Sequence, residues 1–305
     1  MNILVIGASG FVGKPLARAL LSDGHAVRCL ARTPARVQEL ADAGGEVAVG
    51  DISEAASMQR ALAGMDAVYI SIHTLSPQPA STAGQGFVDV ELTGLQNIVA
   101  ACRANGVRRL IYVTFLGVAP DSPSAWVRGR WQAEQLLLGS SLDVTILRPG
   151  QIVGVGGQGF DMMVGQAKKS VAVMLGSGQQ KWRNIALSDL VYSLVGVLGD
   201  PRSYGHAYDV GCDDILTNDQ MVDITADLLG RRPPRKLHLS PKLLSTFAPL
   251  IERLAKLPAG AISGFADSMG SDAVGDPLPL RALLPRPPLS YRDAVARALQ
   301  SKPQA

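Results

Sequence analysis

Asn2-Ile-Leu-Val-Ile-Gly-Ala-Ser-Gly-Phe-Val-Gly13 decides the fold, because a short apolar strand leads directly into three spaced glycines and then into a helix. Gly7 allows a tight turn, Gly10 allows the backbone to approach a pyrophosphate, and Gly13 allows the helix to pack against the strand. The free N–H groups at the start of that helix favour phosphate oxygens. This order of strand, turn and helix predicts a dinucleotide site. The residues expected to line it are Gly7, Ser9, Gly10, Phe11, Val12 and Gly13.

The end of the second predicted strand distinguishes the two nicotinamide dinucleotides. NAD sites carry an acidic residue there for the ribose hydroxyls, whereas a 2′-phosphate requires a cation. This stretch holds no carboxylate and reads Arg28-Cys-Leu-Ala-Arg-Thr-Pro-Ala-Arg36. Arg32 can bind the phosphate through two N–H groups, and Arg36 can assist from the next turn. The alternative is an ordinary exposed arginine pair, so the pattern favours NADP(H) and leaves NAD(H) possible.

Two further strand ends complete the predicted cofactor site. Asp51 and Ile52 follow the third strand, where a carboxylate can accept the adenine amino group and an aliphatic side chain can cover the ring. Asp51 can equally cap the helix that begins near Ser53. Ser71 and Ile72 end the fourth strand and are expected beside the adenosine ribose.

Strand-like and helical patterns alternate through the first half of the chain, which predicts a parallel sheet with helices on both faces. The six expected strands are residues 2–6, 26–31, 46–49, 67–72, 109–114 and 144–147. We therefore expect an α/β fold with a Rossmann-like, doubly wound parallel sheet over residues 1–150. Residues 151–305 are expected to form a smaller C-terminal substrate lobe, interleaved with the sheet, and a Pro/Gly-rich tail.

The expected lobe contains helices over 187–198 and 217–229 and a strand over 207–210, with Thr217 and Asp189 as helix-capping residues. The amphipathic pattern of residues 240–256 predicts a helix that covers the core, with an oligomer contact or a membrane-surface face as alternatives. One group of apolar side chains either lines a substrate cleft or belongs to the core: Phe160, Met162, Met163, Val164 and Met174.

Composition places the chain among α/β proteins with a large core. Of its 305 residues 47% are hydrophobic and 18% are charged, and no apolar run reaches the roughly 18 residues that span a bilayer. The net charge of +3 is too small to indicate nucleic acid, and the three cysteines show neither metal-ligand spacing nor an even count. We expect a cytoplasmic protein that binds a small-molecule substrate, without metal, nucleic acid or integral membrane segment. The oligomeric state stays open.

Several stretches together resemble the short-chain dehydrogenase/reductase superfamily, in particular its atypical NmrA-like branch, which is similar to NAD(P)-dependent epimerase/dehydratase-like proteins and to complex I 39-kDa-type subunits. The matching stretches are residues 7–13, 30–34, 50–51, 89–97, 107–114 and 146–150. The resemblance implies a Rossmann-like sheet, a nicotinamide cofactor and a substrate cleft beneath the C-terminal lobe. It also implies that Pro149 and Ile152 lie beside the nicotinamide.

The chain departs from this superfamily at the catalytic residues. The family pattern is a Ser or Thr after the fifth strand and Tyr-x-x-x-Lys on the next helix, where this sequence has Trp126 and Arg130. An indole N–H cannot act as a general acid or base, whereas Arg130 can still hydrogen-bond a ribose. Thr114 stands near the serine position and can polarise a carbonyl. His73, just after the fourth strand, is a candidate replacement acid.

These observations favour an NADP(H)-binding oxidoreductase that reduces a quinone or enone-like acceptor without the usual Tyr/Lys pair, because hydride transfer requires mainly positioning. The alternative is a non-catalytic NmrA-like protein that senses the nicotinamide redox state or supports an assembly. An isomerase or lyase would need an acid and a base that the sequence does not identify.

Overall fold

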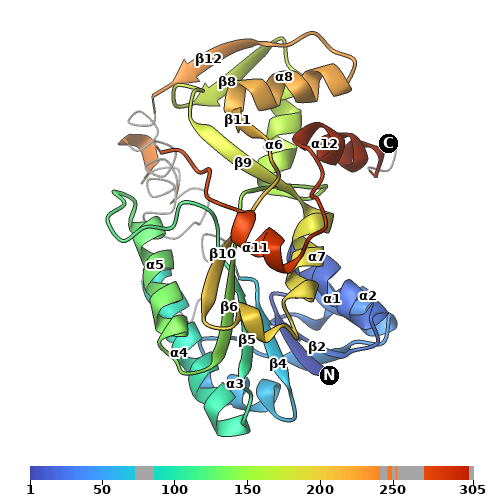
Figure 1. The fold of residues 1–305 in the computed structure, drawn as a ribbon, viewed down its shortest axis with the longest axis vertical. Helices are drawn as coiled ribbons and strands as arrows, with labels where there is room; N and C mark the ends of the chain where they lie inside the picture. The colour runs from blue at the N-terminus through green and yellow to red at the C-terminus, as the bar shows by residue number, and fades with distance from the viewer. Residues whose placement is uncertain (73–85, 241–245, 249–251, 253–270, 302–305) are drawn as a thin grey trace.

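The computed structural model describes residues 1–72, 86–240, 246–248, 252 and 271–301. Within this part of the chain, a seven-stranded sheet with its helices occupies one end of the molecule and a smaller lobe occupies the other (Figure 1). The α/β, Rossmann-like fold expected from the sequence is confirmed. Among the described residues, no helix combines the length and apolarity needed to cross a bilayer.

The large sheet is parallel throughout, in the order β10-β6-β5-β4-β1-β2-β3. Its strands are β1 (Asn2–Ile6), β2 (Ala26–Ala31), β3 (Glu46–Val49), β4 (Ala67–Ile70), β5 (Arg109–Val113), β6 (Asp143–Pro149) and β10 (His206–Val210). All six predicted strands are present, although β4 and β5 end earlier than expected and β6 extends further. The strand order changes direction between β1 and β4, which is where open α/β sheets bind ligands.

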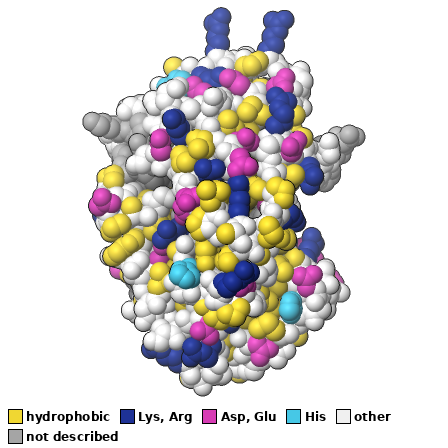
Figure 2. All heavy atoms as spheres, in the orientation of Figure 1, with side chains coloured by type: hydrophobic (Ala, Val, Ile, Leu, Met, Phe, Trp, Pro, Cys, Tyr) yellow, Lys and Arg dark blue, Asp and Glu magenta, His cyan; other side chains and the backbone are white. Residues whose placement is uncertain are grey.

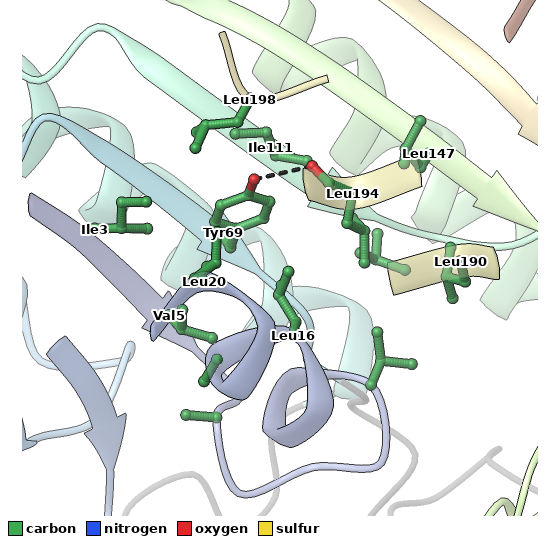
Figure 3. Packing of buried hydrophobic residues seen from close by; sticks show 14 of the residues in the cluster. Ile3, Val5, Leu16, Leu20, Tyr69, Ile111, Leu147, Leu190, Leu194 and Leu198 are labelled. Carbon is green, nitrogen blue, oxygen red and sulfur yellow. Dashed lines mark hydrogen bonds between the residues drawn. The ribbon is translucent and has the colours of Figure 1, made fainter. Parts of the chain in front are cut away.

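Helices cover both faces of this sheet, as strands that are apolar on both sides require. Two clusters of buried side chains separate the helices from the two faces. The helices on one face are α1 (Gly13–Ser22) and α7 (Leu187–Gly196), and those on the other are α3 (Ala55–Leu62), α4 (Phe87–Asn105) and α5 (Ala125–Leu138). Figure 3 shows the first cluster, in which Leu16 of α1 and Leu190 of α7 approach the same region of the sheet. Each such buried side chain contributes roughly 1.5–3 kcal/mol.

Two buried side chains of the sheet fix the C-terminal end of α7. A helix leaves its last carbonyls without partners inside the helix. The Tyr69 hydroxyl of β4 donates to the Leu194 carbonyl at 2.9 Å (Figure 3). The Arg109 guanidinium of β5 donates to the carbonyls of Val197 and Leu198 at 2.6 and 2.8 Å. This arrangement places α7, from the second half of the sequence, firmly on the sheet.

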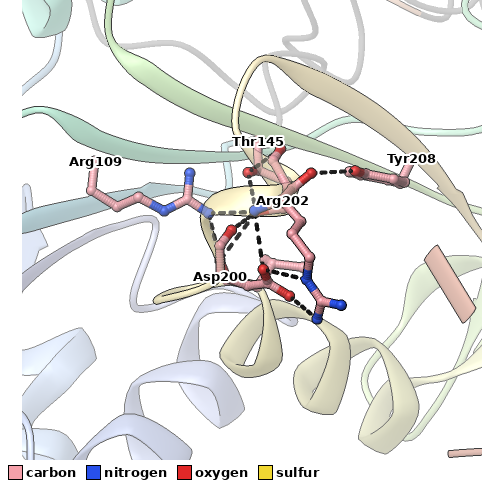
Figure 4. A network of polar contacts seen from close by, with 7 residues as sticks. Arg109, Thr145, Asp200, Arg202 and Tyr208 are labelled. Atoms are coloured by element: carbon pink, nitrogen blue, oxygen red, sulfur yellow. Dashed lines mark hydrogen bonds and ion pairs between the residues drawn. The ribbon is translucent and has the colours of Figure 1, made fainter. Parts of the chain in front are cut away.

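We expect Arg109→Met to lower the free energy of unfolding by about 3 kcal/mol, because it removes the hydrogen bonds from the guanidinium to the carbonyls of Val197, Leu198 and Asp143. Arg202 is a matched control near the same turn (Figure 4), since its guanidinium pairs with Asp200 on the surface. We expect Arg202→Met to cost less than about 1 kcal/mol. Urea unfolding of both variants measures the difference, and equal costs would show that Arg109 does not fix the helix end.

The lobe consists of two small sheets with three helices packed around a core of their own. One sheet has the order β11-β9-β7, and in the other β12 pairs in parallel with β8. The elements are β7 (Gln151–Val153), α6 (Gln158–Ala167), β8 (Val171–Leu175), β9 (Lys181–Ala186), β11 (Ile215–Thr217), α8 (Asn218–Leu228), β12 (Arg235–Leu239) and α12 (Tyr291–Gln300).

The sequence regions of sheet and lobe are interleaved in the structure. The strand predicted over 207–210 is β10, which pairs with β6 at the edge of the large sheet, and α7 also covers that sheet. The predicted N-cap Thr217 is confirmed, because its hydroxyl accepts from the Gln220 amide while the Gln220 side chain accepts from the Thr217 amide.

Two predictions about the second half were wrong. Asp189 does not cap α7; its carboxylate accepts from the Arg286 guanidinium at 2.7 Å and from the Leu289 amide at 2.8 Å, which ties the C-terminal segment to this helix. The Pro/Gly-rich stretch of residues 258–288, whose composition predicts irregular structure, contains α11 (Leu278–Leu283), which contacts β10. Most of the helix predicted over 240–256 lies outside the described residues.

The apolar group that the sequence assigned to either a cleft or a core belongs mainly to the core of the lobe. Four of its members are buried there: Phe160, Met163, Val164 and Met174. Met162 faces solvent instead. These side chains therefore stabilise the lobe.

Candidate functional site

The carboxyl ends of β1 and β4 meet at the reversal in strand order. Gly7 has φ +90°, a conformation that side chains disfavour, and a Cβ there would lie 2.1 Å from the Ser71 carbonyl oxygen. The Ser71 amide also donates to the Ile6 carbonyl at 3.0 Å. Gly7 and Ser71, both expected at the cofactor, are thus direct neighbours.

The other two glycines of the turn have different surroundings. A Cβ on Gly13 would lie 2.1 Å from the Gly7 carbonyl oxygen, so α1 packs too closely on the turn for any side chain. A Cβ on Gly10 would meet only the same oxygen, at 3.0 Å. Gly10 therefore leaves open space in front of the helix N-terminus, as a pyrophosphate would require. Val12 is buried and can offer only its backbone to a ligand, whereas Ser9 is half-buried.

Arg32 directly follows β2 and stands close to Asp51, which follows β3. The Arg32 guanidinium is 48% exposed and 3.9 Å from the Asp51 carboxylate, a separation at which the attraction is weak. Arg36 is exposed in a short 3-10 helix (Pro34–Val37). Two cations and one carboxylate thus lie just beyond the carboxyl ends of β2 and β3.

Asp51 and Ile52 both have partners within the protein. The Asp51 carboxylate accepts from the amide and the hydroxyl of Ser53 at 2.9 and 2.8 Å, which forms a local turn. It does not cap the following helix, as the alternative had it, because α3 begins at Ala55 and has Glu54 as its N-cap residue. Ile52 packs against α4, where a Cβ on Gly94 would lie 2.5 Å from its side chain. Its carbonyl accepts from Asn97.

Phe11 links the cofactor turn to the lobe. Its ring lies against the glycine-rich loop after β7, where a Cβ on Gly157 or Gly154 would be 2.7 or 3.2 Å from the ring. Ile152 of β7 is half-buried against the same hydrophobic core as Phe11. Pro149 ends β6, and its carbonyl accepts from the Leu116 amide at 2.9 Å. The contact between Phe11 and the loop after β7 was not predicted from the sequence, although the glycines of that loop indicated that another part of the chain lies close to its backbone.

Arg130 occupies a buried polar cluster. Its guanidinium lies 2.6 Å from the Glu91 carboxylate of α4 and donates to the Tyr112 hydroxyl at 2.7 Å. It also donates to the Ile72 carbonyl at 3.3 Å. With only 2% of its surface exposed, Arg130 is held by protein partners, in contrast to the ribose contact expected for it.

Tyr112 is buried in the same cluster and hydrogen-bonds Glu91 at 2.5 Å. Burial raises the pKa of its phenol well above the ordinary value, and the neighbouring Arg130 offsets this only in part. A phenol with so high a pKa transfers its proton poorly near neutral pH. Tyr112 therefore does not replace the missing tyrosine.

A second buried carboxylate, that of Glu134, binds Thr114, which stands near the position of the superfamily's catalytic serine. Glu134 of α5 is fully buried, accepts from the Thr114 hydroxyl at 2.9 Å, and forms an ion pair with Arg148 of β6. The Phe115 amide donates to the Thr114 hydroxyl oxygen at 2.5 Å. Hydrogen bonds to Glu134 raise the pKa of Arg148. Because the Thr114 hydroxyl proton is directed at Glu134, this arrangement speaks against its expected role in polarising a carbonyl.

The position of the superfamily's tyrosine is taken by Trp126, which stacks on Phe115 with ring centroids 4.2 Å apart. His73, the candidate acid, lies outside the described residues. The roles of Glu91 and Glu134 were not predicted from the sequence. Glu134 had one available signal, because it follows Arg130 by four residues and so shares its helix face.

Comparison with known proteins places these features in a family. Residues 7–173 match the NAD(P)H-binding family. The chain belongs to this NAD(P)H-binding family, within the atypical short-chain dehydrogenases/reductases. The match includes the glycine turn that follows β1, strands β2 to β7 with the helices between them, and the first residues of β8.

Proteins whose sequences are similar to that of this NAD(P)H-binding protein have diverse names. It is 27% identical to the NAD(P)H azoreductase of Xenophilus azovorans over 75% of the chain and 74% of that protein. It is 32% identical to the photosystem II assembly factor Ycf39 of Cyanophora paradoxa over 48% of the chain, which spans only 44% of that factor. A mitochondrial NADH dehydrogenase subunit of Arabidopsis thaliana is 26% identical over 75% of the chain and 58% of that subunit.

Solved structures share the fold over almost the whole NAD(P)H-binding protein. An NADPH-dependent quinone oxidoreductase of Escherichia coli, solved with NADPH, superposes with a TM-score of 0.73 at 20% identity, covering 98% of this chain and 100% of that one. A nucleoside-diphosphate-sugar epimerase of Pseudomonas aeruginosa gives 0.72 at 21% identity, covering 98% and 96%. At such identities the likeness concerns the fold alone.

Proposed function

We propose that this protein is an NADP(H)-dependent reductase of a quinone or enone-like acceptor that works without a protein proton donor at the usual tyrosine position. The observation that carries the proposal is the arrangement at that position: Trp126 is stacked on Phe115, and Arg130 is held by Glu91. Neither side chain can deliver the proton that reduction of a simple ketone requires. A quinone or activated enone can instead take its proton from water after hydride transfer.

The residues at the carboxyl edge of the sheet fit such a cofactor. We assign the pyrophosphate to the open space at Gly10, with Ser9 and the N-terminus of α1, and the 2′-phosphate to Arg32 and Arg36. Asp51, Ile52, Ser71 and Ile72 are assigned to the adenosine, and Pro149 and Ile152 to the nicotinamide. When bound, the reduced cofactor supplies the hydride, while the protein orients it.

The names of two similar proteins agree with this class of acceptor. An NAD(P)H azoreductase is a relative over three quarters of the chain, and an NADPH-dependent quinone oxidoreductase has the same fold. The azoreductase supports reduction of an acceptor other than a simple ketone, whereas the quinone oxidoreductase agrees in fold alone.

The experiment is anaerobic oxidation of NADPH by the purified protein with a soluble quinone as the acceptor. We expect quinone-dependent turnover, in which substrate positioning supplies most of the acceleration. Binding of NADPH without turnover on any quinone or activated enone would overturn the proposal.

The second candidate is a cofactor-binding sensor or assembly protein. It is favoured by the buried partners of Arg130 and Thr114, which leave neither side chain free for catalysis. The likeness to an assembly factor, which covers 48% of the chain, also favours it. A sensor is expected to bind NADP⁺ and NADPH with clearly different affinities and to show no turnover. Titration calorimetry with both forms distinguishes it from the reductase.

The assignment of the 2′-phosphate to Arg32 is tested by Arg32→Ala. We expect the variant to bind NADPH about 10- to 100-fold more weakly, because it loses a charge-assisted, two-point contact, and to bind NADH unchanged. Arg60→Ala, on the exposed side of α3, is the matched control and should change neither affinity. Equal losses for NADPH and NADH would assign Arg32 to a part of the cofactor that both dinucleotides share.

A further inference from the structure

The sheet formed by β8 and β12 has an apolar outer face at the far end of the lobe. Paired residues of parallel strands face the same side, and the register pairs Leu237 with Val173. The face carries four aliphatic side chains that are 38–53% exposed: Val171, Val173, Leu237 and Leu239. We call these four residues the lobe-end patch.

The opposite face of the same two strands is already covered. Ala172 and Met174 of β8 are buried in the lobe core. Lys236 of β12 donates to Asp223 of α8 at 2.6 Å, and the next inward residue, His238, lies 3.0 Å from Asp219 of that helix. The lobe's own helix thus packs on the inner face, and the lobe-end patch points away from it.

Cations border the lobe-end patch where both strands begin. Lys168 and Lys169 precede β8, Arg231 and Arg232 precede β12, and Arg235 is the first residue of β12; all five are exposed. The two segments are neighbours, since the Arg231 guanidinium donates to the Lys168 carbonyl at 2.8 Å. Residues 162–180 and 228–240 contain no Asp or Glu. Figure 2 shows Lys and Arg side chains projecting from the end of the molecule that carries these strands in Figure 1.

We propose that the lobe-end patch and its bordering cations dock this protein on the surface of an anionic lipid membrane. The aliphatic side chains enter the headgroup region, and the cations attract the lipid phosphates. A protein partner is less well matched, because the patch has no aromatic side chain and binding hot spots are enriched in Trp, Tyr and Arg held in pockets. The docking is peripheral, and the proposal does not depend on the proposed reductase activity.

The test is sedimentation of the full-length protein with phosphatidylcholine vesicles that either contain or lack phosphatidylglycerol. We expect binding only to the vesicles with phosphatidylglycerol. Lys169→Glu/Arg232→Glu should weaken this binding at least about 25-fold, since each cation contributes about fivefold. Leu237→Ser should weaken it about tenfold through lost apolar burial.

Matched controls carry the same changes elsewhere on the surface. Arg60→Glu/Arg297→Glu reverses two exposed cations, and Leu278→Ser removes an aliphatic side chain that is 65% exposed on α11. We expect both to bind within about twofold of the wild type, since neither touches the docking surface. The proposal is overturned if the anionic vesicles do not bind the protein, if both vesicle types bind it equally, or if the patch variants match their controls. Sedimentation velocity tests whether a second copy of the chain binds the lobe-end patch instead. If the protein does not bind vesicles but forms a dimer that Leu237→Ser dissociates, the patch is a contact between two copies of the chain.

Discussion

Arg130→Met is expected to lower the free energy of unfolding by about 3–5 kcal/mol, the largest loss of stability among the substitutions considered. The Arg130 guanidinium lies 2.6 Å from Glu91, and both side chains are almost fully buried. Removing only the cation takes from the buried Glu91 carboxylate a guanidinium that lies 2.6 Å away in a low-dielectric interior, which costs far more than the packing that is lost. Urea unfolding measures the change.

A double variant separates the charge effect from packing. Arg130→Met/Glu91→Leu removes both charges, so we expect it to recover most of the stability lost in Arg130→Met. If the single variant loses less than about 1 kcal/mol, the ion pair is not formed in solution. In that case the Arg130 side chain would be available to the cofactor ribose, and NADPH affinity in Arg130→Met would fall while stability stayed the same.

Gly10→Ala is expected to weaken NADPH binding about 100-fold, or roughly 2.7 kcal/mol. The open space in front of α1 is where we assign the pyrophosphate, and a methyl group there keeps the phosphates from the helix N–H groups. The new Cβ would meet only the Gly7 carbonyl oxygen at 3.0 Å, so a shift of a few tenths of an ångström accommodates it. We therefore expect the variant to fold with nearly wild-type stability. Titration calorimetry and thermal unfolding report the two quantities separately.

Gly165→Ala is the matched control, because a Cβ at that helical position of α6 would meet no atom within 4 Å. It should bind NADPH as the wild type does. Gly13→Ala should instead destabilise the fold, because its Cβ would lie 2.1 Å from the Gly7 carbonyl oxygen. Unchanged NADPH affinity in Gly10→Ala would place the pyrophosphate elsewhere.

The elements of the large sheet could be predicted from sequence because its central strands β1, β4 and β5 are apolar on both sides and the crossover helices each have one apolar face. The glycine turn was equally readable, since the spacing of Gly7, Gly10 and Gly13 restricts the backbone locally. The position of residues 206–210 at the edge of the large sheet could not be predicted from the sequence. The sequence of a short strand does not show which strand it pairs with. The position of β10 depends on its pairing with β6 and on the packing of α7 on the sheet through Arg109.

The contacts of the buried carboxylates at the candidate site could likewise not be predicted from the sequence. Glu91 and Glu134 stand in helices whose sequences allow a solvent-facing glutamate, and only the packing of α4 and α5 on the sheet brings them to Arg130 and Arg148. Asp189 likewise binds Arg286, almost a hundred residues away in the chain. Long-range ion pairs of this kind depend on tertiary geometry, which local patterns do not contain. The residues at the strand ends were predictable because the carboxyl ends of parallel strands converge.

The most direct measurement compares a quinone with a simple ketone as the acceptor, using NADPH under anaerobic conditions and kcat/KM as the readout. The account predicts that the quinone is preferred by at least about 10³-fold, because general acid catalysis is worth about 10²–10⁴-fold and the site lacks the usual acid. Comparable kcat/KM values for the two acceptors would contradict the account, since they would require a proton donor that the described residues do not provide.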